Sequence, residues 1–474
     1  MNKLFYYALA LTLLFGSCRK IEEDNIIIGG DGTDTTGNTT ENTILEGKIS
    51  SDRTLKANYT YKIRGFVYVV NGAKLTIEPG TVIKGEKGAT TRGALVITRG
   101  SQIVADGTAD KPIVFTSDQS NPQRGDWGGI VILGNAKTNA SYNGVQGVGS
   151  VEGGVNTAEG LGLYGGTNDD DNSGVLHYVR IEYAGYAYLP DNELNGLSLA
   201  GVGRSTIVDY VEIYKANDDA IECFGGSVNL KHTIFISTLD DDFDSDNGWS
   251  GKVQWGIVMR DSSIADISKS ESFESDNDAN GSTLLPQTLG IYSNITVVGP
   301  RATTSNIGNS LFLAGAQIRR NSSISIFNSV IMGYPIGLLV DASKGTPTDN
   351  NIKANTLQVQ NTIIAGCDTA VKYSASSTPT GWTTDSAVTW FNTAAYGNSI
   401  LNTNDEVKLT APFNYSAPDF TPQEGSPLLS GAAFADPKLT GNFFTPVTYR
   451  GAVGPAGSPD AEWWKGWSKL DLSL

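Results

Sequence analysis

Carboxylates recur at regular intervals between Asn217 and Asp278. The segment Asn217-Asp218-Asp219-Ala220-Ile221-Glu222 is repeated 22 residues later by Leu239-Asp240-Asp241-Asp242-Phe243-Asp244. A further 30 residues along, Phe273-Glu274-Ser275-Asp276 repeats Phe243-Asp244-Ser245-Asp246. If each repeat forms one turn of the fold, equivalent acids lie about 4.8 Å apart, because that is the spacing of hydrogen-bonded strands. We call this stack of acids the acidic ladder.

A row of stacked carboxylates needs a compensating interaction. Two such groups about 4.8 Å apart repel each other by roughly 3.5 kcal/mol at an effective dielectric of about 20. One explanation is a bound cation, since Ca²⁺ takes about six to eight oxygen ligands and alternate residues of an extended strand share one face. The ligands predicted for such a calcium site are Glu222, Asp242, Asp244, Asp246, Glu274 and Asp276.

A second explanation is cleavage of glycosidic bonds. The pair Asp218-Asp219 resembles the paired aspartates of polygalacturonase-like hydrolases, whose acids on successive turns supply a general acid and a base. Inverting hydrolysis requires carboxyl groups about 6.5–9.5 Å apart. The predicted catalytic residues are Asp218, Asp219, Asp240 and Asp241. The Gly-His-Gly motif of that class is absent from the sequence, whereas a lyase that uses a cation with Arg260 or Lys252 as its base stays open.

A third explanation is purely structural. Acids at turns accept hydrogen bonds from backbone N–H groups and pair with nearby cations, here Lys231, Lys252 or Arg260. Arg319 and Arg320 are further candidates to face the ladder. Adjacent residues of a strand point to opposite sides, so we expect at most one of these two arginines to do so.

Composition favours a fold of short strands and turns. The 474 residues include 55 glycines, only 18% are charged, and few apolar runs have helical spacing. The formal net charge is −16 and the isoelectric point is near 4.6, which disfavours nucleic acid and anionic lipid surfaces as partners because both would be repelled. Cations, neutral glycans and basic proteins remain compatible with this charge.

Internal repeats of short strands predict a parallel β-solenoid, because one repeat cannot bury its apolar face without its neighbours. Residues 75–83 superpose on residues 95–103 at an offset of 20. The strands expected at equivalent places further on are residues 178–182, 210–213, 232–236, 255–258, 294–297, 328–331 and 361–364. In the last three an asparagine opens the strand, and we expect stacked amides that hydrogen-bond to one another.

The chain resembles a right-handed parallel β-helix of the pectin-lyase-like type, and more narrowly the outer-membrane lipoproteins of Bacteroidota and Leptospira. The segments that carry the resemblance are residues 124–129, 180–185, 192–197, 218–222, 224–229 and 231–232. It extends from about residue 60 to the end. The resemblance implies an all-β solenoid at the outer membrane and does not imply a particular reaction.

The N-terminus has the pattern of a lipoprotein signal. Lys3 precedes an apolar stretch from Leu4 to Phe15, which is too short to span a bilayer, and Gly16-Ser17-Cys18 resembles a bacterial lipobox. Cys18 would then carry the lipid. The residues after it resemble the acidic export tag of surface lipoproteins, so we expect a surface-exposed protein anchored to the outer membrane.

The predicted boundaries are 1–17 for the signal peptide, 18–44 for the lipidated cysteine and flexible linker, 45–374 for the β-helix body, and 375–474 for the last turns and a C-terminal cap. Residues 385–394 suit a short amphipathic helix or a loop over the open end. Trp463, Trp464 and Trp467 suit a cap over the last turn or a sugar-stacking platform. Cys223 and Cys367 lie too many turns apart for a disulfide. We expect a monomer that binds Ca²⁺ and no nucleic acid, with a glycan or a surface protein as a further partner.

Overall fold

The computed structural model describes residues 32–33, 39–88, 92–189, 192–377 and 379–472. Two compact units are distinguished, residues 1–42 and residues 43–474. In the first, β1 (Gly32–Thr33) pairs antiparallel with β2 (Thr39–Thr40). The predicted signal peptide and Cys18 lie outside the described residues. No helix in the described parts of the chain is long and apolar enough to cross a membrane.

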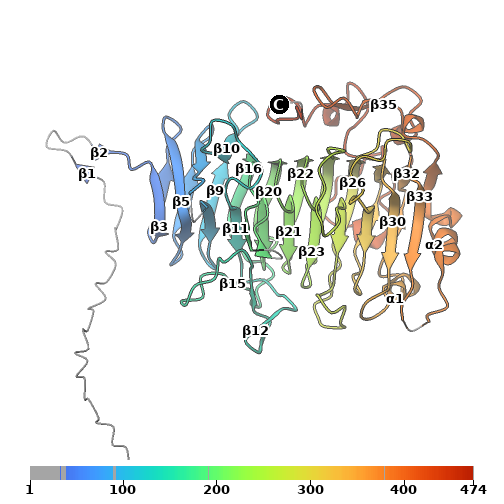
Figure 1. The fold of residues 1–474 in the computed structure, drawn as a ribbon, viewed down its shortest axis with the longest axis horizontal. Helices are drawn as coiled ribbons and strands as arrows, with labels where there is room; N and C mark the ends of the chain where they lie inside the picture. Colours follow the sequence, from blue (N-terminus) through green and yellow to red (C-terminus); the bar gives the residue numbers. More distant parts are fainter. Residues whose placement is uncertain (1–31, 34–38, 89–91, 190–191, 378, 473–474) are drawn as a thin grey trace, which may run out of the picture. The chain divides into compact units, whose positions relative to one another are not determined.

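The second unit is a parallel β-helix, which confirms the predicted all-β solenoid (Figure 1). Each turn, or rung, contributes strands to three parallel faces. The first face contains β4 (Arg53–Leu55), β6 (Lys74–Ile77), β9 (Gln102–Asp106), β28 (Ser325–Phe327) and β31 (Val359–Gln360). The second face contains β7 (Val82–Gly85), β10 (Ile113–Ser117), β29 (Val330–Met332), β32 (Ile363–Ala365) and β34 (Ser399–Leu401).

The third face and the longest strands complete the rungs. The third face contains β8 (Ala94–Ile97), β11 (Gly129–Leu133), β19 (Leu197–Ala200), β21 (Ile221–Phe224), β23 (Phe243–Asp246), β25 (Phe273–Ser275), β27 (Ala314–Ile318), β30 (Ile336–Asp341) and β33 (Thr369–Ser374). The strands that bend across a corner between two faces are β3 (Ile44–Ile49), β5 (Thr60–Val69), β16 (Gly174–Glu182), β20 (Ile207–Tyr214), β22 (Asn229–Ile236), β24 (Lys252–Met259) and β26 (Ile291–Val298).

Short elements decorate the rungs. Four antiparallel hairpins pair β12 (Ser141–Tyr142) with β13 (Val145–Gln146), β14 (Gly149–Ser150) with β15 (Leu163–Tyr164), β17 (Ala187–Leu189) with β18 (Asn192–Glu193), and β35 (Leu409–Ala411) with β36 (Asp419–Pro422). The helices are α1 (Asp349–Lys353), α2 (Thr384–Phe391) and 3-10 turns at Ala394–Tyr396, Asn404–Val407, Pro427–Leu429, Pro437–Leu439 and Pro459–Ala461.

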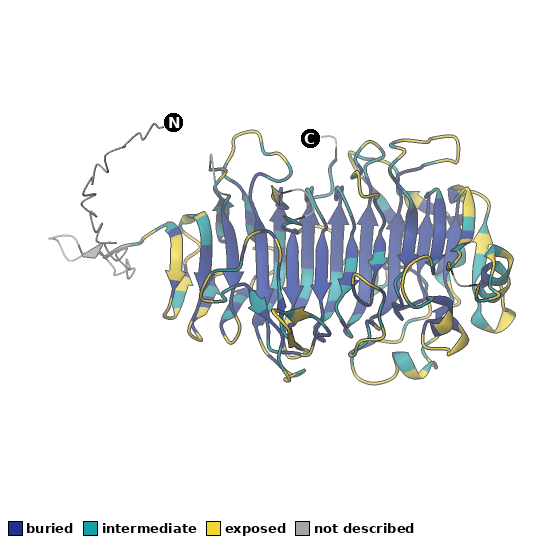
Figure 2. Cartoon of the chain, turned by 60° about the horizontal axis from the view of Figure 1, so that its bottom comes forward, coloured by how far each residue is buried: buried dark blue, intermediate teal, exposed yellow. Residues whose placement is uncertain are grey.

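The core is a continuous column of apolar side chains inside the rungs. Equivalent residues stack directly, for example Ile113 on Val179 and Val179 on Val211, and all three are fully buried. The strand residues of the central rungs are buried almost throughout (Figure 2). Each rung therefore depends on its two neighbours for burial, which is the physical reason for the repeats.

The register of the first rungs differs from the sequence prediction. Leu75 pairs with Ile103, whereas Leu95 pairs with Val67. The offset of 20 between residues 75 and 95 was therefore wrong as a rung period. Both copies have the same pattern of strand, glycine turn and strand, but the two copies lie on different faces of the helix.

A column of residues in the left-handed conformation lines one corner. Tyr178, Tyr210, His232, Trp255 and Asn294 have φ between 46° and 62°. Such a conformation costs roughly 1–2 kcal/mol per residue outside glycine. The rings offset part of this cost by stacking, since Tyr210 has its ring centroid 4.3 Å from that of Tyr178 and 4.2 Å from that of His232.

The asparagines that continue this column do not bond to one another. The Asn294 amide donates to the backbone oxygen of Tyr449 at 3.0 Å, and the Asn328 amide donates to the Ser293 hydroxyl at 3.0 Å. The predicted amide-to-amide ladder is therefore wrong for these two residues. Left-handed backbone is the property that they share with the aromatic residues of the column.

The C-terminal segment covers the side of the helix as well as its end. Helix α2 contributes Ala387 and Phe391 to the core at the last rungs, which confirms the predicted short helix (Figure 1). Trp467 lies edge-on against Tyr178, with ring centroids 5.5 Å apart. Trp463 also packs against a middle rung, with its ring centroid 5.0 Å from that of His232, whereas Trp464 packs against Phe420 of β36. The prediction of a cap on the last turn was therefore wrong for Trp463 and Trp467. Cys223 and Cys367 are free thiols, as predicted.

Candidate metal centre

The predicted register of the acidic ladder is confirmed. Ile221 pairs with Phe243 and Phe243 pairs with Phe273 along β21, β23 and β25. Glu222, Asp244 and Glu274 consequently form a column on three successive rungs. The spacing predicted from the sequence thus brings the acids together on the third face.

A second column lies at the turns that lead into these strands, and backbone groups hold it. The Asp241 N–H donates to Oδ1 of Asp219 at 2.8 Å, and the Glu271 N–H donates to Oδ1 of Asp241 at 2.6 Å. Each carboxylate therefore accepts a hydrogen bond from the equivalent residue one rung further. This arrangement fixes the acids in place and leaves other carboxylate oxygens for a further interaction.

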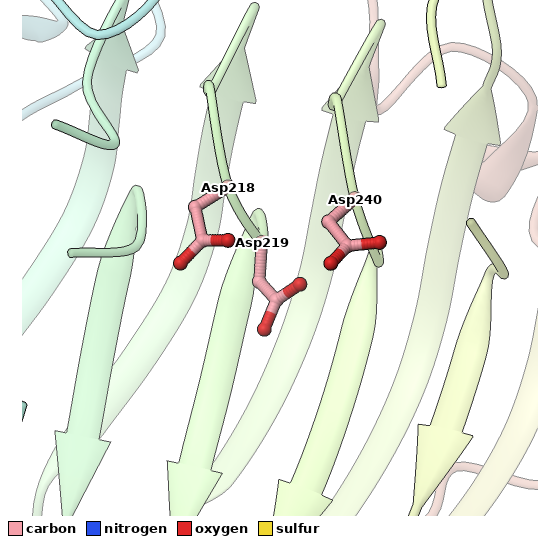
Figure 3. A group of neighbouring side chains, drawn as sticks. All are labelled: Asp218, Asp219 and Asp240. Carbon is pink, nitrogen blue, oxygen red and sulfur yellow. The ribbon is translucent and has the colours of Figure 1, made fainter. Parts of the chain in front are cut away.

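The first acid cluster consists of five residues on two rungs. Asp218, Asp219 and Asp240 have carboxylate oxygens within 4.8 Å of one another, and so do Asp219, Glu222 and Asp244. Figure 3 shows the first three on the same side of the turns before β21 and β23. None of the five takes part in any ion pair formed between described residues. The ion pairs nearest to them on the ladder are Arg260–Asp242, Arg319–Glu274, Arg319–Asp276 and Arg320–Asp276.

Neutral donors satisfy only part of the first acid cluster. Asn195 donates to Oε2 of Glu222 at 2.8 Å, and the Ser268 hydroxyl donates to Oδ2 of Asp240 at 2.7 Å. The other oxygen of Asp240, Oδ1, is buried and has no hydrogen-bond partner. The cluster therefore has a surplus of acceptors over donors.

Burial and mutual repulsion raise the pKa values of these acids. Burial, and after it the Asp240 carboxylate, raises the pKa of Asp218 well above its usual range, and burial with Asp218 does the same to the pKa of Asp219. Burial raises the pKa of Asp240 to about 8. Burial and the Asp276 carboxylate raise the pKa of Asp244 to about 6. The acids resist ionisation unless a cation compensates them.

A second acid cluster lies one rung further. It consists of Asp241, Glu271 and Glu274, whose carboxylate oxygens also lie within 4.8 Å of one another. Arg319 forms an ion pair with Glu274. The two clusters together contain all four predicted catalytic aspartates and three of the six predicted metal ligands.

The other three predicted ligands lie apart from these clusters. Asp242 is completely buried and pairs with Arg260 at 3.0 Å. Asp276 pairs with Arg319 at 2.9 Å and with Arg320, and Asp246 accepts from its neighbour Asn247. The structural explanation thus applies to Asp242 and Asp276. Arg260 has no exposed surface with which to act as the base of a lyase.

Both adjacent arginines contact the ladder, contrary to the expectation of at most one. The strand alternation behind that expectation ends at Ile318, where β27 ends. Arg320 has φ of 45°, in the left-handed region. The chain therefore turns at this point, and Arg319 and Arg320 reach the same carboxylate, that of Asp276.

Glu271 is the residue that the sequence prediction missed. The alignment of Phe243 with Phe273 places Glu271 opposite Asp241, so the signal was present in the sequence. Glu271 precedes Phe273, the residue at which the third copy of the acidic pattern begins. Its identity as a glutamate and not an aspartate also made the repeat less visible.

Comparison with known proteins identifies a match over most of the chain. A family model for a pectate-lyase-like β-helix domain matches residues 47–406, a range that includes all the acids of the ladder. The predicted right-handed β-helix is thereby confirmed. No curated protein and no solved structure matches the chain.

The raised pKa values predict how stability depends on pH in the absence of divalent cations. A carboxyl group with a raised folded-state pKa holds its proton in the folded chain at pH values where the unfolded chain has lost it, so its stabilisation is complete below about pH 4 and is lost as pH rises. The window extends through the pKa of Asp244, about 6, to that of Asp240, about 8. In EDTA we expect the melting temperature to fall between pH 5 and pH 8.5.

Differential scanning calorimetry across this range tests the prediction. Asp244→Asn should flatten the decline, because the amide does not ionise. The Asp110→Asn variant, at an exposed position away from the ladder, is the control and should follow the wild type. A melting temperature that rises steadily from pH 5 to pH 8.5 would contradict the assignment.

Proposed function

The chain belongs to the family of pectate-lyase-like β-helix domains, and we propose that it is a lipid-anchored protein of the outer-membrane surface whose acidic ladder binds Ca²⁺. The observation that carries the proposal is the first acid cluster, five acids on two rungs that form no ion pair among the described residues. A bound divalent cation would supply the positive charge that balances these carboxylates.

The ligand set favours a hard cation. All five candidate ligands are carboxylates, and oxygen donors suit Ca²⁺ and Mg²⁺ better than softer transition metals. Ca²⁺ accepts irregular sets of about six to eight oxygens, whereas Mg²⁺ requires a nearly ideal octahedron. Residues fixed by strand register, such as Glu222 and Asp244, suit the less demanding ion.

Calcium binding should be measurable as both heat and stability. We expect the EDTA-treated wild type to bind Ca²⁺ in isothermal titration calorimetry at pH 8. A free Ca²⁺ concentration of about 100 times the Kd should stabilise the fold by about 2.7 kcal/mol. The double variant Asp219→Asn/Asp244→Asn should lose most of this stabilisation, whereas Asp110→Asn should keep it. A wild type without heat or thermal shift at millimolar Ca²⁺ would refute calcium binding.

A second candidate function is polysaccharide cleavage by Asp218, Asp219, Asp240 and Asp241. The observation in its favour is the pKa of about 8 for Asp240, which would keep a general acid protonated at neutral pH. Against it, three of these four aspartates have oxygens within 4.8 Å, closer than inverting hydrolysis requires.

The cleavage hypothesis predicts products from glycans. Incubation with acidic and neutral polysaccharides would yield new reducing ends from a hydrolase or unsaturated ends from a lyase. The Asp240→Asn variant should then lose activity while remaining folded. A panel without any product in the presence of Ca²⁺ would count against both forms of the enzyme.

The proposed anchor depends on Cys18. Its lipobox-like setting supports attachment of the protein to the outer membrane by a lipid on this residue. In a diderm bacterial host we expect the wild type to incorporate labelled palmitate and to enter the detergent phase of a Triton X-114 partition. The Cys18→Ala variant should do neither, and equal partition of the two proteins would contradict the anchor.

A further inference from the structure

Glu271 ends the chain of hydrogen bonds that holds the turn column. Asp219 and Asp241 each accept the N–H of the equivalent residue on the next rung. On the following rung the Leu313 N–H donates to the backbone oxygen of Ser270 at 3.1 Å and not to the Glu271 carboxylate. Glu271 is 1% exposed, and its Oε1 is buried without a hydrogen-bond partner.

The Glu271 side chain belongs to a cluster of buried and half-buried carboxylates. Glu271, Asp241 and Glu274 each offer an oxygen, and the three oxygens lie within 4.8 Å of one another. A buried acceptor without a hydrogen-bond partner destabilises the fold, and more so when it is charged. A cation bound by all three oxygens would remove this destabilisation.

The charged groups of the second acid cluster and its surroundings have a net charge of −2 when all the carboxyl groups are ionised. Asp241, Glu271, Glu274 and Asp276 supply four carboxylates on two neighbouring rungs. Arg319 and Arg320 supply two guanidinium groups, which pair with Glu274 and Asp276. A single divalent cation would therefore neutralise the cluster, and bidentate binding by three carboxylates would provide up to about six oxygens.

We propose that the second acid cluster is a separate divalent-cation site, with Asp241, Glu271 and Glu274 as ligands. This inference rests on the proposed function, because it assigns a second ion to the same ladder. Among the described residues no arginine forms an ion pair with a carboxylate of the first cluster, whereas Arg319 forms one with Glu274 of the second. The two sites therefore differ in charge, and we expect two binding events of different affinity.

Protonation is the competing explanation for the second cluster. Burial raises the pKa of Glu271 to about 7, so a proton could occupy the cluster below neutral pH. A cation that binds there must displace protons, because carboxylate ligands bind in the ionised form. Calcium binding at this site should consequently release protons at pH 7 and weaken as the pH falls.

Calcium titration of the full-length mature protein in detergent, after EDTA treatment and at pH 8, tests the inference. We expect two Ca²⁺ per chain for the wild type. Glu271→Gln should bind one, and the first-cluster variant Asp219→Asn/Asp244→Asn should also bind one. Because the glutamine keeps the shape and removes a buried acid, Glu271→Gln should melt no lower than the wild type in EDTA at pH 8.

The possible outcomes separate this inference from the proposed function. One Ca²⁺ in the wild type and the same affinity in Glu271→Gln would overturn the second site and leave the first intact. Two Ca²⁺ in both proteins would also overturn it. No binding by the wild type would refute both proposals. If Glu271→Gln fails to fold, Glu274→Gln replaces it in the test. This variant should also bind one Ca²⁺ where the wild type binds two.

Discussion

The register of parallel strands between neighbouring rungs determines the rest of this structure. Hydrogen bonding places equivalent residues of successive rungs about 4.8 Å apart, so every side chain meets its counterpart above and below. Apolar residues such as Val179 and Val211 gain from this because they bury one another. Acids at equivalent positions, such as Glu222 and Asp244, are forced together by the same register and must be compensated.

The acids of the ladder are compensated in two ways, and some of their oxygens are not fully compensated. Asp242 and Asp276 receive arginines, Asp219 and Asp241 receive backbone N–H groups, and the remaining oxygens receive too few donors. Acids in the last class have raised pKa values because the surrounding strands exclude water. The family provides the helical scaffold, whereas the proposed cation binding depends on acids confined to three rungs of it.

The period of the ladder could be predicted from the sequence, because residues one repeat length apart lie next to each other once the rungs stack. The offsets from Ile221 to Phe243 and from Phe243 to Phe273 were both confirmed. The sequence did not show which face each strand joins, and residues 75 and 95 were therefore aligned although they lie on two different faces. It also did not show that Asp242 pairs with Arg260, which directly follows β24, or that the backbone is left-handed at Arg320.

The contacts of the C-terminal segment impose an order on folding. Arg180 donates to the backbone oxygen of Trp467, and Tyr214 donates to that of Asp471, across 287 and 257 residues of sequence. Rungs can form successively from local neighbours, but these contacts require that the middle rungs already exist when the end of the chain arrives. A chain that emerges N-terminus first therefore leaves the aromatic column uncovered until residues 463–471 have been synthesised. These residues cover the column only after the rungs beneath them have formed.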